Sequence, residues 1–108
     1  MDAKQVRQQL ASIEQAIQRA SQACQNDQST PEDLKESVRE LNEQSRQAHE
    51  FLQTEDDQEA IRQCIDDLEE TGDRAREACE SAGNVSGPLR DAVLTAHQQI
   101  SRLKHQLH

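Results

Sequence analysis

The stretch Arg19-Ala20-Ser21-Gln22-Ala23-Cys24 recurs 55 residues later as Arg74-Ala75-Arg76-Glu77-Ala78-Cys79. When residues 1–53 are laid over residues 56–108, 12 positions are identical: Asp2, Arg7, Gln8, Glu14, Arg19, Ala20, Ala23, Cys24, Leu34, Val38, Gln44 and Leu52. Chance at this composition would give roughly four. We therefore predict an internal duplication of one helical hairpin. The first copy spans residues 2–53 and the second spans 56–108, within one domain covering 1–108.

Apolar residues recur at alternating spacings of four and three in four segments, as amphipathic helices require. These core stripes are Val6, Leu10, Ile13, Ile17, Ala20 and Cys24; Leu34, Val38, Leu41, Ser45, Ala48 and Leu52; Ile61, Ile65, Leu68, Gly72, Ala75 and Cys79; and Leu89, Val93, Ala96, Ile100, Leu103 and Leu107. Stripes of equal length joined by short polar loops predict an all-α fold, an antiparallel up-down-up-down four-helix bundle with left-handed supercoiling. A monomer is favoured, because one chain satisfies every stripe, and a homodimer of opened hairpins is the competing assembly.

Polar residues and glycine predict the helix boundaries. Thr30 is expected to cap the second helix with Asp33 in a capping-box position, and Thr54 to cap the third together with the acidic residues that follow it. Gly83-Asn84 is typical of a helix end, and Ser86-Gly87-Pro88 of a helix start.

The composition excludes several classes of partner. The net charge is −9, and Phe51 is the only aromatic residue. Nucleic acids and anionic membranes need a basic surface, so neither is expected as a partner. No apolar run has the length of a signal peptide or a membrane span, which makes the cytoplasm the expected location. Three cysteines, an odd number, fit a reducing compartment.

The candidate thiols are Cys24, Cys64 and Cys79. Cys24 and Cys79 are expected in one core layer, but on diagonal helices, beyond the roughly 7 Å between Cα atoms that a disulfide tolerates. Their ordinary role is that of small core residues, and Cys64 flanks its stripe as a partly exposed thiol. His49, His105 and His108 are expected to gather at the opposite end with Glu50, where a weak metal site is a minor alternative. His97 is expected to be solvated.

The segment from Glu55 to Asp73 carries nine carboxylates against the single base Arg62. Its candidate partner-binding face consists of Glu55, Asp56, Glu59, Asp66, Asp67, Glu70 and Asp73. Such a face suits a basic protein partner through complementary potential and steering. The alternative is a solvated helix face that keeps a weakly hydrophobic chain in solution.

Gly72 interrupts the third stripe in mid-helix. Close helix approach is the favoured interpretation, ahead of a kink and of a small pocket.

No catalytic motif is present, and neither Glu-x-x-His nor Cys-x-x-Cys occurs. We predict a non-enzymatic interaction module without a cofactor, such as an adaptor, a chaperone-like protein or a regulatory partner. It would bind a protein through the acidic face or through an apolar hairpin groove. The alternative is a thiol- or metal-responsive sensor that uses Cys24, Cys79 and Cys64.

Overall fold

Each of the four core stripes lies on one helix. The computed structural model describes residues 2–108, as α1 (Ala3–Asn26), α2 (Glu32–Thr54), α3 (Gln58–Ala82) and α4 (Gly87–Leu107). No strand occurs among these residues. The prediction of an all-α chain with four helices is therefore confirmed.

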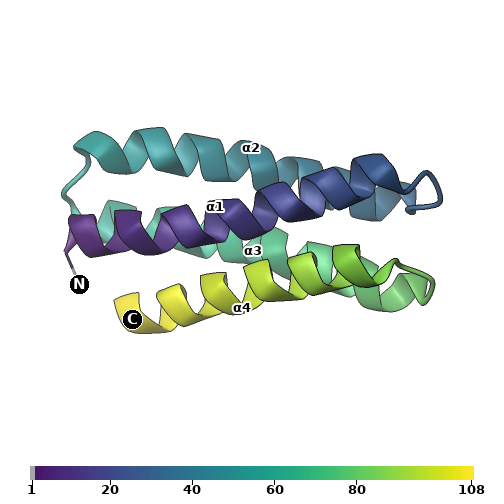
Figure 1. Cartoon of the computed structure of the whole chain (residues 1–108). Coiled ribbons are helices and arrows are strands. Elements are labelled where there is room, and N and C mark those ends of the chain that lie inside the picture. Colours follow the sequence, from purple (N-terminus) through teal and green to yellow (C-terminus); the bar gives the residue numbers. More distant parts are fainter. Residues whose placement is uncertain (1) are drawn as a thin grey trace.

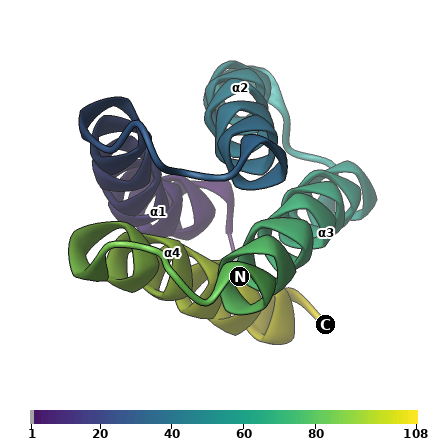
Figure 2. The same cartoon turned by 90° about the vertical axis from the view of Figure 1, so that its right-hand side faces the viewer.

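The helices pack as a bundle in which each contacts its neighbours in the chain and α1 also contacts α4. The chain reverses direction at every loop, so the N- and C-termini lie at the same end (Figure 1). Viewed along the bundle, the helices follow the order α1, α2, α3, α4 around a common core (Figure 2). The pairs α1–α3 and α2–α4 are therefore diagonal. The molecule measures 42 × 21 × 17 Å along its principal axes.

The core consists almost entirely of the predicted stripes. Of the 24 stripe positions only Cys24 and Leu107, each at the end of its stripe, are incompletely buried. Ser45 is the buried polar exception, and its hydroxyl donates to the Asn42 carbonyl oxygen at 2.9 Å in its own helix. That local bond satisfies the hydroxyl without a partner from another helix.

Three further residues beside the stripes are buried. Ala16 on α1 and Ala92 on α4 lie where these two helices meet, and Thr71 lies on α3. A stripe of one residue per turn is narrower than the face that a bundle helix buries, so small residues beside it are also covered.

Two of the predicted caps were wrong. Asp57 caps α3, with its carboxylate accepting from the Glu59 amide at 3.1 Å, while Thr54 is the last residue of α2. Thr30 does not cap α2, because its hydroxyl donates back to the Asp27 carbonyl oxygen at 2.8 Å. The other boundaries are confirmed. Gly83 ends α3 with a φ of 67°, and the Ser86 hydroxyl accepts from the Leu89 amide at the start of α4.

Gly72 does not break its helix, since α3 runs without interruption from Gln58 to Ala82. A Cβ placed on Gly72 would lie 3.5 Å from Ile100 Cδ1 and 3.9 Å from His97 Cδ2 on α4. These are ordinary van der Waals distances, so α3 and α4 lie close at this point but leave room for a methyl group.

Candidate functional site

An open groove lies between α2 and α3, and we call it the α2–α3 groove. Its volume is about 480 Å³, and its lining comprises Ala48, Phe51, Ala60, Cys64 and Leu68 together with Gln44, Gln47, Gln63 and Asp67. Phe51 is 39% exposed and is the one exposed large hydrophobic side chain among residues 2–108. An apolar lining with a few polar groups is typical of a binding site.

The α1–α4 interface differs at the positions 55 residues away. There Gln9 Nε2 donates to Gln106 Oε1 at 2.7 Å, which links the two helices. Cys64 occupies the position that corresponds to Gln9, and Phe51 the position that corresponds to Gln106. A polar link in one half of the molecule is thus replaced by an aromatic ring and a thiol in the other. This replacement makes the α2–α3 groove apolar.

Gln44 brings an unsatisfied acceptor to the α2–α3 groove. Its Oε1 atom is buried and has no hydrogen-bond partner among the described residues, and the same holds for Oε1 of Gln99, 55 residues later. Buried polar atoms are normally paired, so an N–H donor supplied by a ligand would find an acceptor here.

Part of the predicted acidic face is turned toward α4 and paired within the molecule. Asp73 lies 2.6 Å from His97 Nε2, and Asp66 lies 3.0 Å from His108 Nε2. Between them Glu69 accepts from Lys104 Nζ at 3.0 Å and from the Ser101 hydroxyl at 3.2 Å. The Glu69 carboxylate raises the pKa of Lys104. These three carboxylates therefore join α3 to α4.

The other predicted acidic residues lie elsewhere around α3. Asp67 lines the α2–α3 groove, where it accepts from Gln63 Nε2 at 3.0 Å. Glu59 pairs with Arg62 at 3.1 Å, and Glu55 accepts from the Asp57 amide in the preceding loop. Asp56 and Glu70 are exposed. The structure therefore places the seven predicted residues in three settings, namely the α3–α4 contact, the α2–α3 groove and the exposed side of α3 with its preceding loop.

Charge is distributed unequally between the two halves of the bundle. Six carboxylates and three bases leave α2 with a net charge of −3, and eight carboxylates and three bases leave α3 with −5. By contrast, α1 and α4 each carry three bases and one carboxylate, a net charge of +2 with neutral histidines. The α2–α3 half is therefore acidic, and the α1–α4 half is basic.

The three cysteines are free thiols of low reactivity. Burial raises the pKa of Cys24 and of Cys79, and burial followed by the charge of Asp67 raises the pKa of Cys64 to about 11. The thiolate is the nucleophile and the metal ligand, so all three side chains are protonated at neutral pH. Cys79 is buried as predicted, whereas Cys24 is only partly buried.

The predicted gathering of histidines does not form. His49 lies 3.4 Å from Glu14 on α1, whereas His108 pairs with Asp66 on α3. His97 is not fully solvated either, since its side chain is only 18% exposed beside Asp73. Among residues 2–108 no three histidine, cysteine or acidic side chains converge in a way that could hold a metal ion.

The sequence does not single out Phe51 as part of a binding site. The available signal was that Phe51 follows α2 one residue before the core residue Leu52, and that the corresponding position 106 is polar.

Within the described part of the chain, no helix has the length and the apolar character needed to cross a membrane. Comparison with protein-family models, with curated proteins and with solved structures finds no match to this chain.

Proposed function

We propose that this protein is a non-enzymatic interaction module that binds a basic amphipathic helix of a protein partner in the α2–α3 groove. The observation that carries the proposal is the exposed Phe51 in an apolar groove on the acidic half of the bundle. Aromatic side chains in partly enclosed pockets are the usual anchors of protein interfaces.

The shape of the groove favours a helix as the ligand. It runs between two helices and offers Ala48, Ala60 and Leu68 beside the Phe51 ring. Small residues let a bound helix approach closely, and its apolar side chains would cover the ring and the Cys64 thiol. A volume of about 480 Å³ lies in the range of roughly 300–1,000 Å³ that is usual for binding sites.

The charge of the surrounding helices favours a basic ligand. The net charges of −3 on α2 and −5 on α3 attract a cationic segment and raise its association rate. Asp67 in the groove and Glu70 on the exposed side of α3 are available to lysine or arginine residues beside the apolar anchors.

Peptide binding tests this proposal. A synthetic 18-residue amphipathic helix of leucine and lysine, labelled for fluorescence anisotropy, serves as the probe. Its matched control is the same composition in a permuted order without an apolar face. Phe51→Ala is expected to weaken binding of the amphipathic peptide about tenfold, as truncation of an anchor does. Gln106→Ala, the corresponding change in the other half, is expected to leave binding unchanged. Equal binding of both peptides, or of the wild type and Phe51→Ala, contradicts the proposal.

A thiol- or metal-responsive role for Cys24, Cys79 and Cys64 is the second proposal. What favours it is that Cys24 and Cys79 lie near enough for a charge on Cys79 to raise the pKa of Cys24. The protonated state of all three thiols weighs against it. A stoichiometric metal in the purified protein would support this role.

We further propose that the hairpins 2–53 and 56–108 arose by duplication and fold as one domain. Glu14 and His49 form an ion pair between α1 and α2, and the positions 55 residues later, Glu69 and Lys104, form one between α3 and α4. Three free cysteines fit the reducing cytoplasm that we propose as the location.

A further inference from the structure

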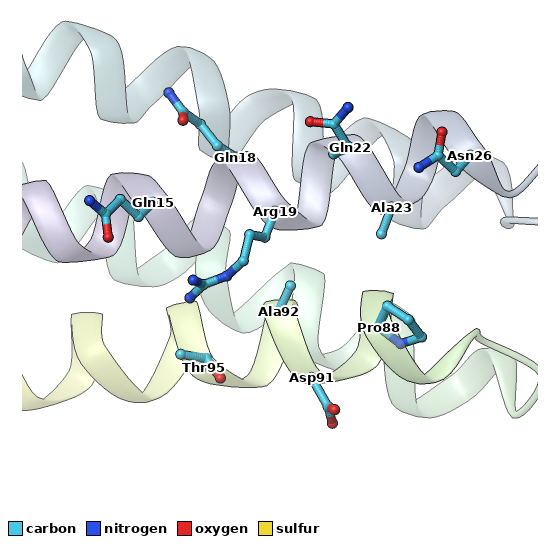
Figure 3. A pocket seen from close by; sticks show the side chains of 10 residues that line it. All are labelled: Gln15, Gln18, Arg19, Gln22, Ala23, Asn26, Pro88, Asp91, Ala92 and Thr95. Carbon is cyan, nitrogen blue, oxygen red and sulfur yellow. The ribbon is translucent and has the colours of Figure 1, made fainter.

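A second and larger groove lies on the opposite, basic half of the bundle. This α1–α4 groove has a volume of about 780 Å³ and is lined by Gln15, Gln18, Arg19, Gln22, Ala23 and Asn26 of α1 and by Pro88, Asp91, Ala92 and Thr95 of α4. Figure 3 shows the Arg19 side chain extending from α1 toward α4, whereas Asp91 points away from α1. The guanidinium therefore reaches into the space between the two helices.

The corresponding surface of α2 and α3 is far more acidic. Gln15, Gln18 and Gln22 stand where α3 has Glu70, Asp73 and Glu77, and Pro88 stands where α2 has Asp33. Amides have replaced the carboxylates without a large change in size. The α1–α4 groove thus keeps hydrogen-bonding groups but has lost most of the negative charge that its counterpart carries.

Arg19 has lost the partner that its counterpart retains. Arg74, 55 residues later, donates to Glu40 on α2 at 2.6 Å. Thr95 occupies the position that corresponds to Glu40, and Arg19 makes no ion pair or side-chain hydrogen bond to any of residues 2–108. A guanidinium binds a carboxylate through two parallel hydrogen bonds, a geometry that the Arg74 site supplies internally and the Arg19 site does not.

We propose that the α1–α4 groove binds an acidic helical segment of a protein partner, with one of its carboxylates paired to Arg19. The net charge of +2 on each of α1 and α4 complements such a segment. Ala23 and Ala92 let a helix approach closely, and the three glutamine amides run along one side of the groove. A nucleic acid is a poor fit, because the groove has one cation where a phosphate chain needs several.

This site is independent of the α2–α3 groove and extends the proposed function. With both sites the protein is a two-sided adaptor that joins a basic helix to an acidic one.

The experiment measures binding of a labelled 18-residue amphipathic helix of leucine and glutamate, in about 50 mM salt so that screening is modest. Its matched control peptide carries glutamine in place of every glutamate. Arg19→Ala removes the cation, and Thr95→Glu supplies an internal carboxylate that pairs with Arg19 as Glu40 pairs with Arg74. Each is expected to weaken binding of the acidic peptide at least tenfold. Arg74→Ala and Phe51→Ala, on the opposite half, are expected to leave it unchanged.

Circular dichroism of each variant checks folding, which neither change threatens because Arg19 is exposed and Thr95 is not buried. The proposal is overturned if the wild type does not bind the acidic peptide, if the glutamine peptide binds equally, or if both groove variants bind like the wild type. It is also overturned if sedimentation shows that the protein self-associates through Arg19, because the occupant is then a second copy of this chain. Phe51→Ala weakens only the basic peptide, so the two proposals fail separately.

Discussion

At the scale of single residues, Gly72 occupies a position where alanine would fit. A Cβ there would make ordinary contacts with Ile100 and His97, and the backbone of Gly72 does not have a positive φ. Glycine in a helix interior costs about 1 kcal/mol relative to alanine. Gly72→Ala is therefore expected to raise the free energy of unfolding by about 1 kcal/mol, as measured by urea denaturation.

The matched control for Gly72 is Gly83→Ala. Gly83 has open space around it but a φ of 67°, so a side chain there strains the backbone and is expected to lower stability. A loss of stability in Gly72→Ala would mean that α3 and α4 are closer than the structure has them.

Cys64 provides a second prediction at this scale. Its pKa of about 11, against an ordinary value of 9.0, means that the folded protein holds the thiol proton more tightly than the unfolded chain does. The stability that this contributes is fully present below about pH 9 and is lost as the pH rises toward 11. In a Cys24→Ala, Cys79→Ala background, iodoacetamide at pH 8 is expected to alkylate Cys64 at least tenfold more slowly in the folded protein than in urea.

Asp67→Asn serves as the companion variant for Cys64. It removes the negative charge that is the second cause of the raised pKa, so alkylation of the folded protein is expected to become faster. Equal rates for the folded and unfolded chain would show that the thiol is open to solvent and would favour the sensor proposal.

At the scale of elements, the start of α3 depends on Asp57. Its carboxylate accepts from the Glu59 amide, and replacing such a cap by alanine costs about 1 kcal/mol. Asp57→Ala is expected to lower the free energy of unfolding by that amount. Thr54→Ala, at the last residue of α2, is expected to change it by less than about 0.5 kcal/mol. The reverse order in urea denaturation would mean that Thr54 caps α3 in solution.

The helices could be predicted from the sequence because the spacing of apolar residues depends on helix geometry alone. Val6 to Ala20 and Leu34 to Leu52, for instance, are buried as that spacing requires. The caps at Thr54 and Thr30 were wrong because several polar residues stand at each helix start, and local hydrogen bonds decide among them.

The α2–α3 groove could not be predicted from the sequence, because it arises between two helices. Phe51 gains its role from Cys64 and Ala60, which belong to another helix. His97 likewise could be placed beside Asp73 only when the rotation of α4 against α3 was known. Periodicity fixes which side of a helix is buried but not which flanking residues meet across an interface.

At the scale of the whole molecule, the order of the helices gives the bundle its electrical polarity. The acidic helices α2 and α3 are neighbours, and so are the basic helices α1 and α4. Had the acidic helices been diagonal, the same charges would have been spread evenly around the bundle. Each of the two grooves therefore lies within a surface of one predominant charge, which is why we assign them partners of opposite charge.

The mass in solution is the last prediction, because it shows which surfaces are free to bind. Nearly every stripe residue is buried within one chain, which leaves little apolar surface to drive a strong dimer. Light scattering during size-exclusion chromatography at physiological salt is therefore expected to give about 12.2 kDa, with and without reductant. A dimer that reductant dissociates would instead implicate an accessible cysteine, with Cys64 as the first to replace. A dimer that reductant leaves intact would mean that hairpins are exchanged or that a groove is occupied by a second copy. Phe51→Ala would separate these two cases, because it should dissociate a dimer held by the α2–α3 groove and leave exchanged hairpins together.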